Sequence, residues 1–299
     1  MTYNFTRPLI MGILNITKDS FSDGSKYLNT DDAVQWALKM IEEGADIIDI
    51  GGESTRPGAE VINEEVEIER VMGVFKKLKI RCQESQIPLP LISIDTYKSK
   101  VARTALEAGA DIINDVYALR YDDTMASVLQ DFPESKIVLM HMQGTPATMQ
   151  MNPFYEDVVS EITDFFEERI NYCLNRGISK DRIILDPGIG FGKTFEHNIT
   201  ILKNMEKFHV FGLPVLLGAS RKRFIGQMYS IGNAFLRSVD SQNQLYASED
   251  TERINALPTD RLIGSLASTM LAYLKKIDII RVHDVKEHRE LLDSLSWMF

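Results

Sequence analysis

The chain has 299 residues, 33 of them basic and 43 acidic, so its formal net charge at pH 7 is −10. Nucleic-acid surfaces need clustered Lys and Arg, so this charge argues against a nucleic-acid partner. No apolar run approaches the roughly 20 residues that span a bilayer, and the N-terminal MTYNFTRP lacks the apolar core of a signal peptide. There are only two cysteines, Cys82 and Cys173, which are far apart in the chain. We therefore expect a cytoplasmic, enzyme-sized protein without a membrane or disulfide framework.

Eight short apolar runs rich in Ile, Val and Leu recur along the chain. Continuous apolarity indicates strands buried on both faces, as in a parallel sheet covered by helices. The predicted strands are Leu9–Leu14, Ile47–Ile50, Leu91–Ile94, Ile112–Ile113, Ile137–Met140, Ile183–Leu185, Val215–Leu217 and Ile279–Val282. Eight βα units over this length predict an α/β protein of one domain, residues 1–299, folded as a single (β/α)₈ TIM barrel. A doubly wound open sheet is the alternative, since apolar patterns do not show whether a sheet closes.

The segments between the predicted strands have helical spacing of apolar residues. One such helix follows Thr30 and ends at Gly44, and another runs from Val158 to Leu174 before Gly177. The sequence GADIID at Gly44 recurs as GADIIN at Gly109, each time where a helix ends and a strand begins. This echo supports a repeated βα architecture.

Polar residues that bind ligands or do chemistry follow nearly every predicted strand. They are Asn15, Asp49 leading to Glu53, Asp95, Asn114 with Asp115, His141, Asp186, Ser220 with Lys222, and Arg281 with His283. Any one of them could simply cap the next helix or turn. In a barrel, however, all would converge on the mouth formed by the carboxyl ends of the strands, where such folds place active sites.

Basic residues after the last two strands predict an anion site. Residues 220–223, SRKR, begin a helix, where cations oppose the dipole and a merely solvated role is less favourable. Arg281 and His283 are two apart on a strand and so point the same way. Arg56, in the loop GGESTRPGAE, is a further candidate for a carboxylate or phosphate. The segment DPGIGFGKT does not match a phosphate-binding P-loop, because Pro187 stands where that motif needs Gly.

Asp95, Asn114 and Asp186 form a complementary set of acceptors. Two carboxylates and an amide suit a flat heterocycle that offers an amidine-like donor edge and ring N–H groups. A protein-only metal cluster is not expected, because metal-binding histidine motifs are lacking and the five histidines are scattered. His197 and His288 are expected on helix surfaces.

Long motifs identify a resemblance that runs from the first predicted strand to the last. The chain resembles the dihydropteroate synthases, the folate-pathway enzymes targeted by sulfonamides. The matching motifs are NITKDSFSDG at Asn15, GGESTRPGA at Gly51, SIDT at Ser93, IINDV at Ile112, HMQGTP at His141, DPGIGFGKT at Asp186, GASRKRFIG at Gly218 and IIRVHDV at Ile279. The family fold is a (β/α)₈ barrel, in agreement with the independent strand count.

The resemblance implies a transferase that condenses 6-hydroxymethyl-7,8-dihydropterin pyrophosphate with p-aminobenzoate, giving 7,8-dihydropteroate and pyrophosphate with Mg²⁺ as cofactor. The implied catalytic residues are Asp95, Asp186 and Lys222. The implied pterin site consists of Asp95, Asn114, Met140, Asp186 and Lys222. The implied pyrophosphate site consists of Asn15, Arg56, Arg281 and His283, with Asn15 also at the metal. The implied p-aminobenzoate pocket consists of Phe21, Thr55, Pro57, Phe191 and Ser220. The family also suggests a homodimer through the last helices.

Departures from the family pattern concern loops. Lys18 replaces the more frequent Pro, Ser25 a common Gly, and Arg223 a smaller residue, which bears on p-aminobenzoate affinity. The segment 227–257 is longer than the family's usual seventh helix and loop, and it is polar. We therefore expect an extended surface excursion or an oligomer contact there.

Other functions remain possible on sequence grounds. The main alternative is a pterin-binding corrinoid methyltransferase-like enzyme, which shares the barrel but has no use for the basic loops. A Schiff-base aldolase using Lys222 and a pterin-binding protein without activity are further alternatives.

Overall fold

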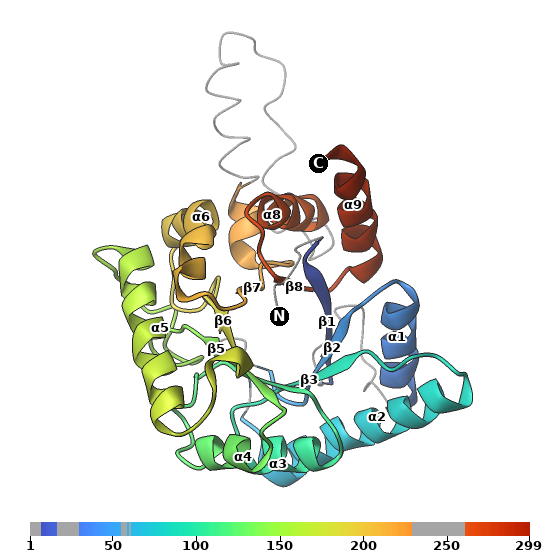
Figure 1. Ribbon diagram of the computed structural model, residues 1–299. Helices are drawn as coiled ribbons and strands as arrows, with labels where there is room; N and C mark the ends of the chain where they lie inside the picture. The colour runs from blue at the N-terminus through green and yellow to red at the C-terminus, as the bar shows by residue number, and fades with distance from the viewer. Residues whose placement is uncertain (1–6, 17–29, 55–58, 60, 229–260) are drawn as a thin grey trace.

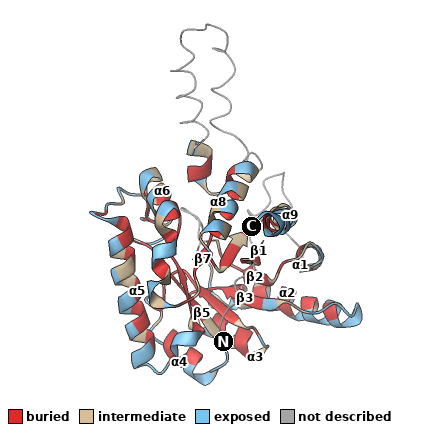
Figure 2. Cartoon of the chain, turned by 45° about the horizontal axis from the view of Figure 1, so that its top comes forward, coloured by how far each residue is buried: buried red, intermediate tan, exposed pale blue. Residues whose placement is uncertain are grey.

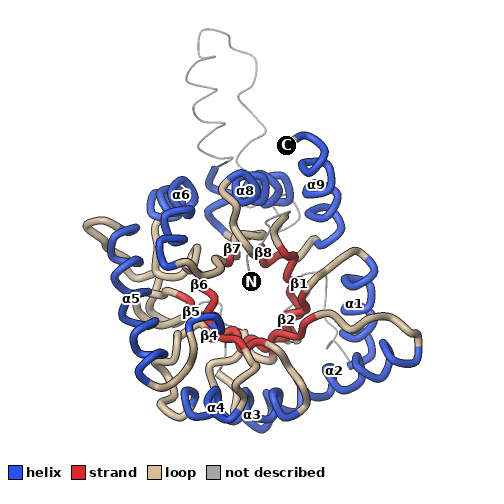
Figure 3. The backbone as a smooth tube through the Cα atoms, in the orientation of Figure 1, coloured by secondary structure: helices blue, strands red, loops and turns tan. Residues whose placement is uncertain are grey.

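The computed structural model describes residues 7–16, 30–54, 59, 61–228 and 261–299. Eight parallel strands form one sheet in the order β6-β5-β4-β3-β2-β1-β8-β7, and a parallel bridge between Leu185 and Val215 brings its two ends together. The strands form the inner ring and the helices the outer ring (Figures 1 and 3). The prediction of a (β/α)₈ barrel is therefore confirmed, and the open-sheet alternative is wrong.

The bounds of the elements follow the sequence expectations closely. The strands are β1 Leu9–Asn15, β2 Ile47–Gly51, β3 Leu91–Asp95, β4 Ile112–Asp115, β5 Lys136–Met140, β6 Ile183–Asp186, β7 Leu216–Leu217 and β8 Ile279–Val282. The helices are α1 Thr30–Glu42, α2 Glu64–Glu84, α3 Ser99–Glu107, α4 Met125–Asp131, α5 Val158–Asn175, α6 Phe195–Asn204, α8 Leu262–Leu274 and α9 Val285–Met298, with 3₁₀ turns η1 Lys180–Arg182 and η2 Met205–Phe211. Most of the expected excursion at 227–257 lies outside the described residues.

The echoed GADII segments build the same structural device twice. Gly44 and Gly109 both have a φ of +95°, a conformation that glycine adopts without penalty and that ends each preceding helix. The next aspartates, Asp46 and Asp111, then accept a hydrogen bond at 2.8 Å from a backbone N–H of the neighbouring strand. Asp278 does the same before β8, accepting from the Val215 N–H at 2.8 Å. These contacts tie neighbouring strands together at the amino end of the barrel.

The alternation of side chains along each strand divides the core into two layers. Outward-facing residues such as Ile48, Ile94 and Leu185 pack against the helices in one large cluster. Inward-facing residues form a smaller apolar layer that fills the barrel: Met11, Ile47, Ile112, Val138, Ile184, Leu216 and Ile279. Figure 2 shows the resulting pattern, with buried strands in the centre and exposed residues on the outer helix faces.

The inner layer determines where the polar residues lie. Two residues beyond Ile47, Ile112, Ile184 and Ile279 on the same strands are Asp49, Asn114, Asp186 and Arg281, and these therefore also face the interior. An apolar floor at the amino end of the barrel thus supports a polar layer at the carboxyl end.

Candidate active site

Arg281 joins the carboxylates of two strands at the barrel mouth. Its Nε donates to Asp49 Oδ2 at 2.6 Å and its Nη2 donates to Asp95 Oδ2 at 2.8 Å. Asn114 Nδ2 donates to the same Asp49 oxygen at 3.1 Å. The expected pterin and pyrophosphate residues are thus brought together around Asp49, which sequence reasoning noted at a strand end but did not assign to the site. Its inward register, shared with Asn114 and Arg281, is the signal that could have assigned it.

The burial of these groups changes their acidity. Burial raises the pKa of the Asp95 carboxyl to about 7, although the attraction of Arg281 opposes that shift. Burial likewise raises the pKa of Asp186, against the attraction of Lys222. The pKa of Lys222 falls to about 8 because burial disfavours its ammonium, which Asp186 partly offsets. The mouth therefore contains groups that change charge near neutral pH, as is common at catalytic sites.

The loop after β6 brings Lys222 close to Asp186. Gly188 N donates to Asp186 Oδ1 at 2.7 Å, and Lys222 Nζ donates to the carbonyl of Ile189. The ammonium also lies 4.5 Å from the centre of the Phe191 ring. Gly190 has a φ of +81°, and a Cβ there would lie 3.1 Å from Lys222 Cδ. The glycines of DPGIGFG thus allow the backbone to approach this lysine closely, which explains a motif that fits no nucleotide fingerprint.

The expected anion loops contact each other directly. Ser220 Oγ lies 3.2 Å from both the backbone nitrogen and Nδ1 of His283. Arg221, for which the sequence predicts an anion-binding role, forms a two-point ion pair with Asp284. Arg223 is exposed at the start of a helical turn. Lys222 is therefore the side chain of this loop that lies with the mouth carboxylates.

An apolar cluster lines the β3–β5 side of the mouth. Met140 packs in it with Tyr97, Val116, Met142 and Met149, and the partly buried Tyr117 and Phe191 pack against it. Met140 and Phe191, which the resemblance assigns to the pterin and p-aminobenzoate pockets, therefore share one cluster. A planar ligand held by the carboxylates would find an apolar wall here.

A buried charge network beside the mouth was missed by sequence reasoning. Lys98 Nζ donates to Glu53 Oε2 at 2.7 Å, to Glu67 Oε2 at 2.6 Å and to the carbonyl of Ile62 at 2.7 Å. Tyr97 donates to the other oxygen of Glu53 at 2.5 Å. Because the partners come from α2 and from the loops after β2 and β3, their spacing in the sequence gives no sign of the contact.

Two other strand-end residues have local structural roles. Asp115 accepts hydrogen bonds from the N–H groups of Tyr117 and Leu119, at 2.8 and 2.7 Å, so it stabilises its own turn. His141 Nδ1 lies 2.9 Å from Lys193 Nζ, and burial together with this lysine lowers the pKa of His141 to about 2. For these residues the capping and packing interpretation is the better one.

The expectation for one histidine is wrong. His288 is 0 % exposed, and its Nδ1 lies 2.8 Å from Thr269 Oγ1 between α9 and α8. His197 is partly exposed and forms a capping box with Thr194 at the start of α6. The helical positions were recognised, but which helix face is covered depends on the neighbouring helix.

Several expected site residues lie outside the described residues: Phe21, Thr55, Arg56 and Pro57, as do the departures Lys18 and Ser25. Asn15 is described and ends β1 beside β2. A Cβ built on Gly51 would lie 3.2 Å from Asn15 Oδ1 and 3.7 Å from Asp95 Oδ2. The Asn15 amide is therefore close to the carboxylates of the mouth.

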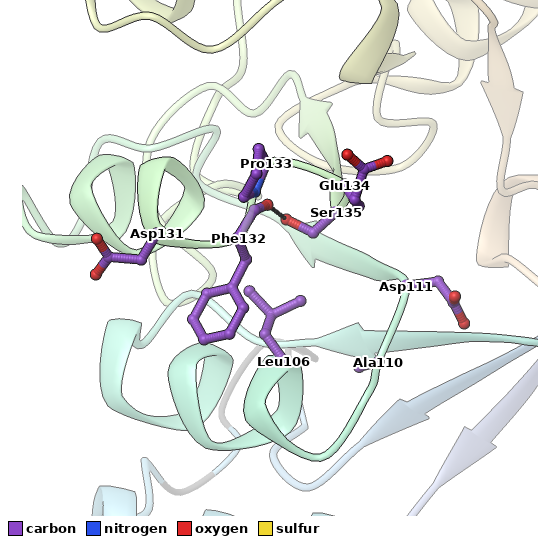
Figure 4. Close-up of a pocket in the computed structure, with 8 residues that line it drawn as sticks. All are labelled: Leu106, Ala110, Asp111, Asp131, Phe132, Pro133, Glu134 and Ser135. Atoms are coloured by element: carbon purple, nitrogen blue, oxygen red, sulfur yellow. Dashed lines mark hydrogen bonds between the residues drawn. The ribbon is translucent and has the colours of Figure 1, made fainter.

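A cavity of about 250 Å³ lies at the other end of the barrel (Figure 4). Asp111 and Ser135, in its lining, directly precede β4 and β5, so it opens near the amino ends of the strands. Phe132 and Leu106 form part of its wall. It is separate from the polar layer at the carboxyl ends.

Comparison with known proteins decides the family. Residues 11–283 match the model of the pterin binding enzyme family. The dihydropteroate synthase of Escherichia coli K12 is 41% identical over 289 residues, which are 97% of this chain and 91% of that enzyme. The chain belongs to the dihydropteroate synthase family. It is a transferase of folate biosynthesis, which confirms the resemblance seen in the motifs.

Solved structures of the dihydropteroate synthase family have the same fold. The Yersinia pestis enzyme in a sulfonamide drug complex gives a TM-score of 0.83 at 38% identity, covering 100% of this chain and 96% of that chain. The Xanthomonas albilineans enzyme with 4-aminobenzoic acid gives a TM-score of 0.81 at 38% identity, covering 98% and 93%. These likenesses span the barrel from end to end.

Proposed function

We propose that the polar layer at the barrel mouth is where this chain condenses 6-hydroxymethyl-7,8-dihydropterin pyrophosphate with p-aminobenzoate. The observation that carries the proposal is the convergence of Asp95, Asn114 and Asp186 from three strands on the side of the mouth that also holds Lys222. Buried carboxylates are costly without donors, and the N–H groups of a pterin pyrimidine edge would supply them. Lys222 reaches the ring atoms, and Met140 covers the ring face.

The pyrophosphate is held by Arg281, His283 and Asn15, with Arg56 as a further partner. The Arg281 side chain is 19% exposed and so reaches the mouth. Its positive charge stabilises the negative charge that develops on the departing pyrophosphate. His283 follows two residues later, and its contact with Ser220 holds it next to the loop that follows β7.

Departure of pyrophosphate leaves a cationic methylene conjugated to the dihydropterin. Asp95 and Asp186 act on this cation through their charge, and the weakly basic arylamine of p-aminobenzoate then forms the new C–N bond and releases a proton. Lys222 keeps the pterin ring in place during this exchange. Phe191 and Ser220 line the proposed p-aminobenzoate pocket, to which the resemblance also assigns Phe21, Thr55 and Pro57, outside the described residues. The bound arylamine excludes water, which would otherwise capture the cation.

Mg²⁺ is the proposed cofactor. Among the residues that the structure describes, no group of three or more His, Cys, Asp or Glu is arranged to hold a metal ion. Mg²⁺ commonly keeps several waters and binds through one or two protein oxygens together with substrate phosphates. The Asn15 amide oxygen, close to the Asp95 carboxylate, fits this arrangement. When bound, the ion would neutralise pyrophosphate charge.

A homodimer through the last helices is also proposed. Ile263, Met270 and Leu274 are exposed on one face of α8, and Trp297 and Phe299 are exposed at the end of α9. Apolar patches of this kind mark protein interfaces. Met270→Glu is expected to give monomers in analytical ultracentrifugation, and a wild-type chain that sediments as a monomer would contradict the proposal.

The proposed cellular location is the cytoplasm. Within the described ranges, no helix is both long enough and apolar enough to cross a bilayer.

Pyrophosphate release tests the proposed function. The wild-type chain is supplied with dihydropterin pyrophosphate and Mg²⁺, with and without p-aminobenzoate, and a coupled assay follows pyrophosphate. We expect release that depends on p-aminobenzoate. Pyrophosphate release that does not depend on p-aminobenzoate, or no release at all, would contradict the proposal.

A further inference from the structure

Arg221 and Asp284 connect the two loops that the proposed function assigns to pyrophosphate. Arg221 Nε donates to Asp284 Oδ2 at 2.9 Å, and its Nη2 donates to the other carboxylate oxygen. The preceding residues of the same two loops are Ser220 and His283, whose contacts at 3.2 Å lie beside this pair. Consecutive residues of one loop thus pair with consecutive residues of the other.

The backbone of Arg221 is fastened in a conformation that is unfavourable for arginine. Its φ is +56°, in the left-handed region, which is unfavourable for a residue with a side chain unless its surroundings hold it there. Its N–H donates to Ser265 Oγ at 3.0 Å, and its carbonyl accepts from Arg261 Nη1 at 3.0 Å. Ser265 of α8 and Arg261 at its N-terminal end therefore hold the backbone of Arg221 in place.

Asp284 is committed to the same contact. It stands at the N-cap position of α9, where an aspartate usually accepts hydrogen bonds from the first turn of its helix, but its side chain makes no such bond. The carboxylate pairs with Arg221 instead, and it is only 14% exposed. The pair therefore forms at the cost of a helix cap at Asp284 and of a favourable backbone conformation at Arg221.

We propose that Arg221 is a positioning residue: through its two-point pair with Asp284 it holds His283 at the pyrophosphate, and it does not itself bind the anion. This inference rests on the proposed function. Planar guanidinium–carboxylate pairs fix orientation as well as distance, which a flexible lysine in the same place would not do. Lys222 has a separate anchor on the Ile189 carbonyl, so the pterin side of the mouth does not depend on the pair.

Inhibition by inorganic pyrophosphate tests the proposal. The variants are Arg221→Met, Asp284→Asn and their combination, with Arg289→Met and Asp293→Asn as matched controls, since these two pair with each other on the outer part of α9. We expect each single variant to raise the pyrophosphate inhibition constant about tenfold, equivalent to about 1.4 kcal/mol. The inhibition constant of the double variant should be no higher than that of the more affected single variant, because both changes break the same contact. The controls should stay within about twofold.

Asp284→Asn separates positioning from direct binding. If Arg221 binds pyrophosphate itself, removing the neighbouring negative charge should strengthen pyrophosphate inhibition, whereas positioning predicts weaker inhibition. Binding of 6-hydroxymethylpterin, which lacks phosphates, should be unchanged in all variants and shows that the rest of the mouth is intact. The proposal is overturned if pyrophosphate inhibits Asp284→Asn as strongly as the wild type or more strongly. It is also overturned if the losses of pyrophosphate affinity in the two single variants add up in the double variant, or if the variants lose 6-hydroxymethylpterin affinity as much as pyrophosphate affinity.

The wild-type enzyme distinguishes this proposal from the function on which it rests. If pyrophosphate fails to inhibit the wild type, the proposed pyrophosphate pocket is wrong, and the positioning role is wrong with it. If pyrophosphate inhibits the wild type and Arg221→Met equally, only the positioning role is overturned.

Discussion

Replacing Arg281 by Met should destabilise the fold markedly. The guanidinium donates at 2.6 Å to Asp49 and at 2.8 Å to Asp95, whose side chains are 0 % and 9 % exposed. Removing one partner of a buried ion pair costs about 3–5 kcal/mol, since an uncompensated charge remains. An unfolding entropy of about 2.1 cal/mol/K per residue gives roughly 0.6 kcal/mol/K for this chain, so Tm should fall by about 5–8 °C.

The loss should grow with pH. Arg281 favours the charged form of Asp95 and opposes the burial that raises its pKa to about 7. Without the guanidinium, the Asp95 pKa should rise further. A carboxyl with a folded-state pKa above its unfolded-state pKa stabilises the fold when protonated, and this contribution is lost as pH rises through the folded-state pKa. The Tm deficit of Arg281→Met should therefore be larger at about pH 9 than at about pH 6.

Scanning calorimetry of the wild type and two variants measures this. The control is Arg103→Met, which removes an exposed pair with Asp131 that is expected to contribute about 0–1 kcal/mol. The reasoning is refuted if Arg281→Met loses no more Tm than Arg103→Met, or if its deficit is the same at both pH values.

Three further predictions follow from the contacts of the mouth and its loops. Lys222→Ala should lower kcat/KM for the pterin substrate strongly, and a near-normal kcat/KM would contradict the role of Lys222. In the wild type, kcat/KM should decline above about pH 8 as the Lys222 ammonium loses its proton. Lys98→Met, which leaves two buried glutamates without their positively charged partner, should lower Tm by several degrees in calorimetry, whereas the exposed Lys100→Met should change it little. Gly188→Ala should yield little folded protein, because its Cβ would meet the His141 carbonyl at 1.9 Å, whereas Gly177→Ala, with a similar φ and open space, should cost only about 1–2 kcal/mol in denaturant unfolding.

The strands and the residues at their ends could be predicted because their signals are local. Runs such as Ile47–Ile50 show burial on both faces, and the polar residue that follows each run marks the carboxyl end of a strand. The family motifs then supplied roles for residues such as Asn114 and Asp186. Helix ends at Gly44 and Gly177 followed from backbone conformations that glycine adopts most easily.

The interpretation was wrong or incomplete where a residue's partner comes from a distant part of the chain. His288 has helical spacing typical of an exposed position, but α8 covers it. Arg221 has the sequence context of an anion ligand, and nothing in the sequence indicates its ion pair with Asp284. In both cases the deciding contact is between elements, and a single sequence contains no record of it.

The amino-acid sequence was enough to predict eight βα units, the order of the polar residues along them and the family to which the chain belongs. These depend on periodicity and on motifs, which are properties of neighbouring residues. The folded chain was needed to show that the sheet closes, that Arg281 contacts Asp49 from 232 positions away, and that Lys98 is buried between two glutamates. Such pairs are selected by the geometry of the closed barrel, because closure brings the carboxyl ends of all the strands into one low-dielectric space where each charge needs a partner.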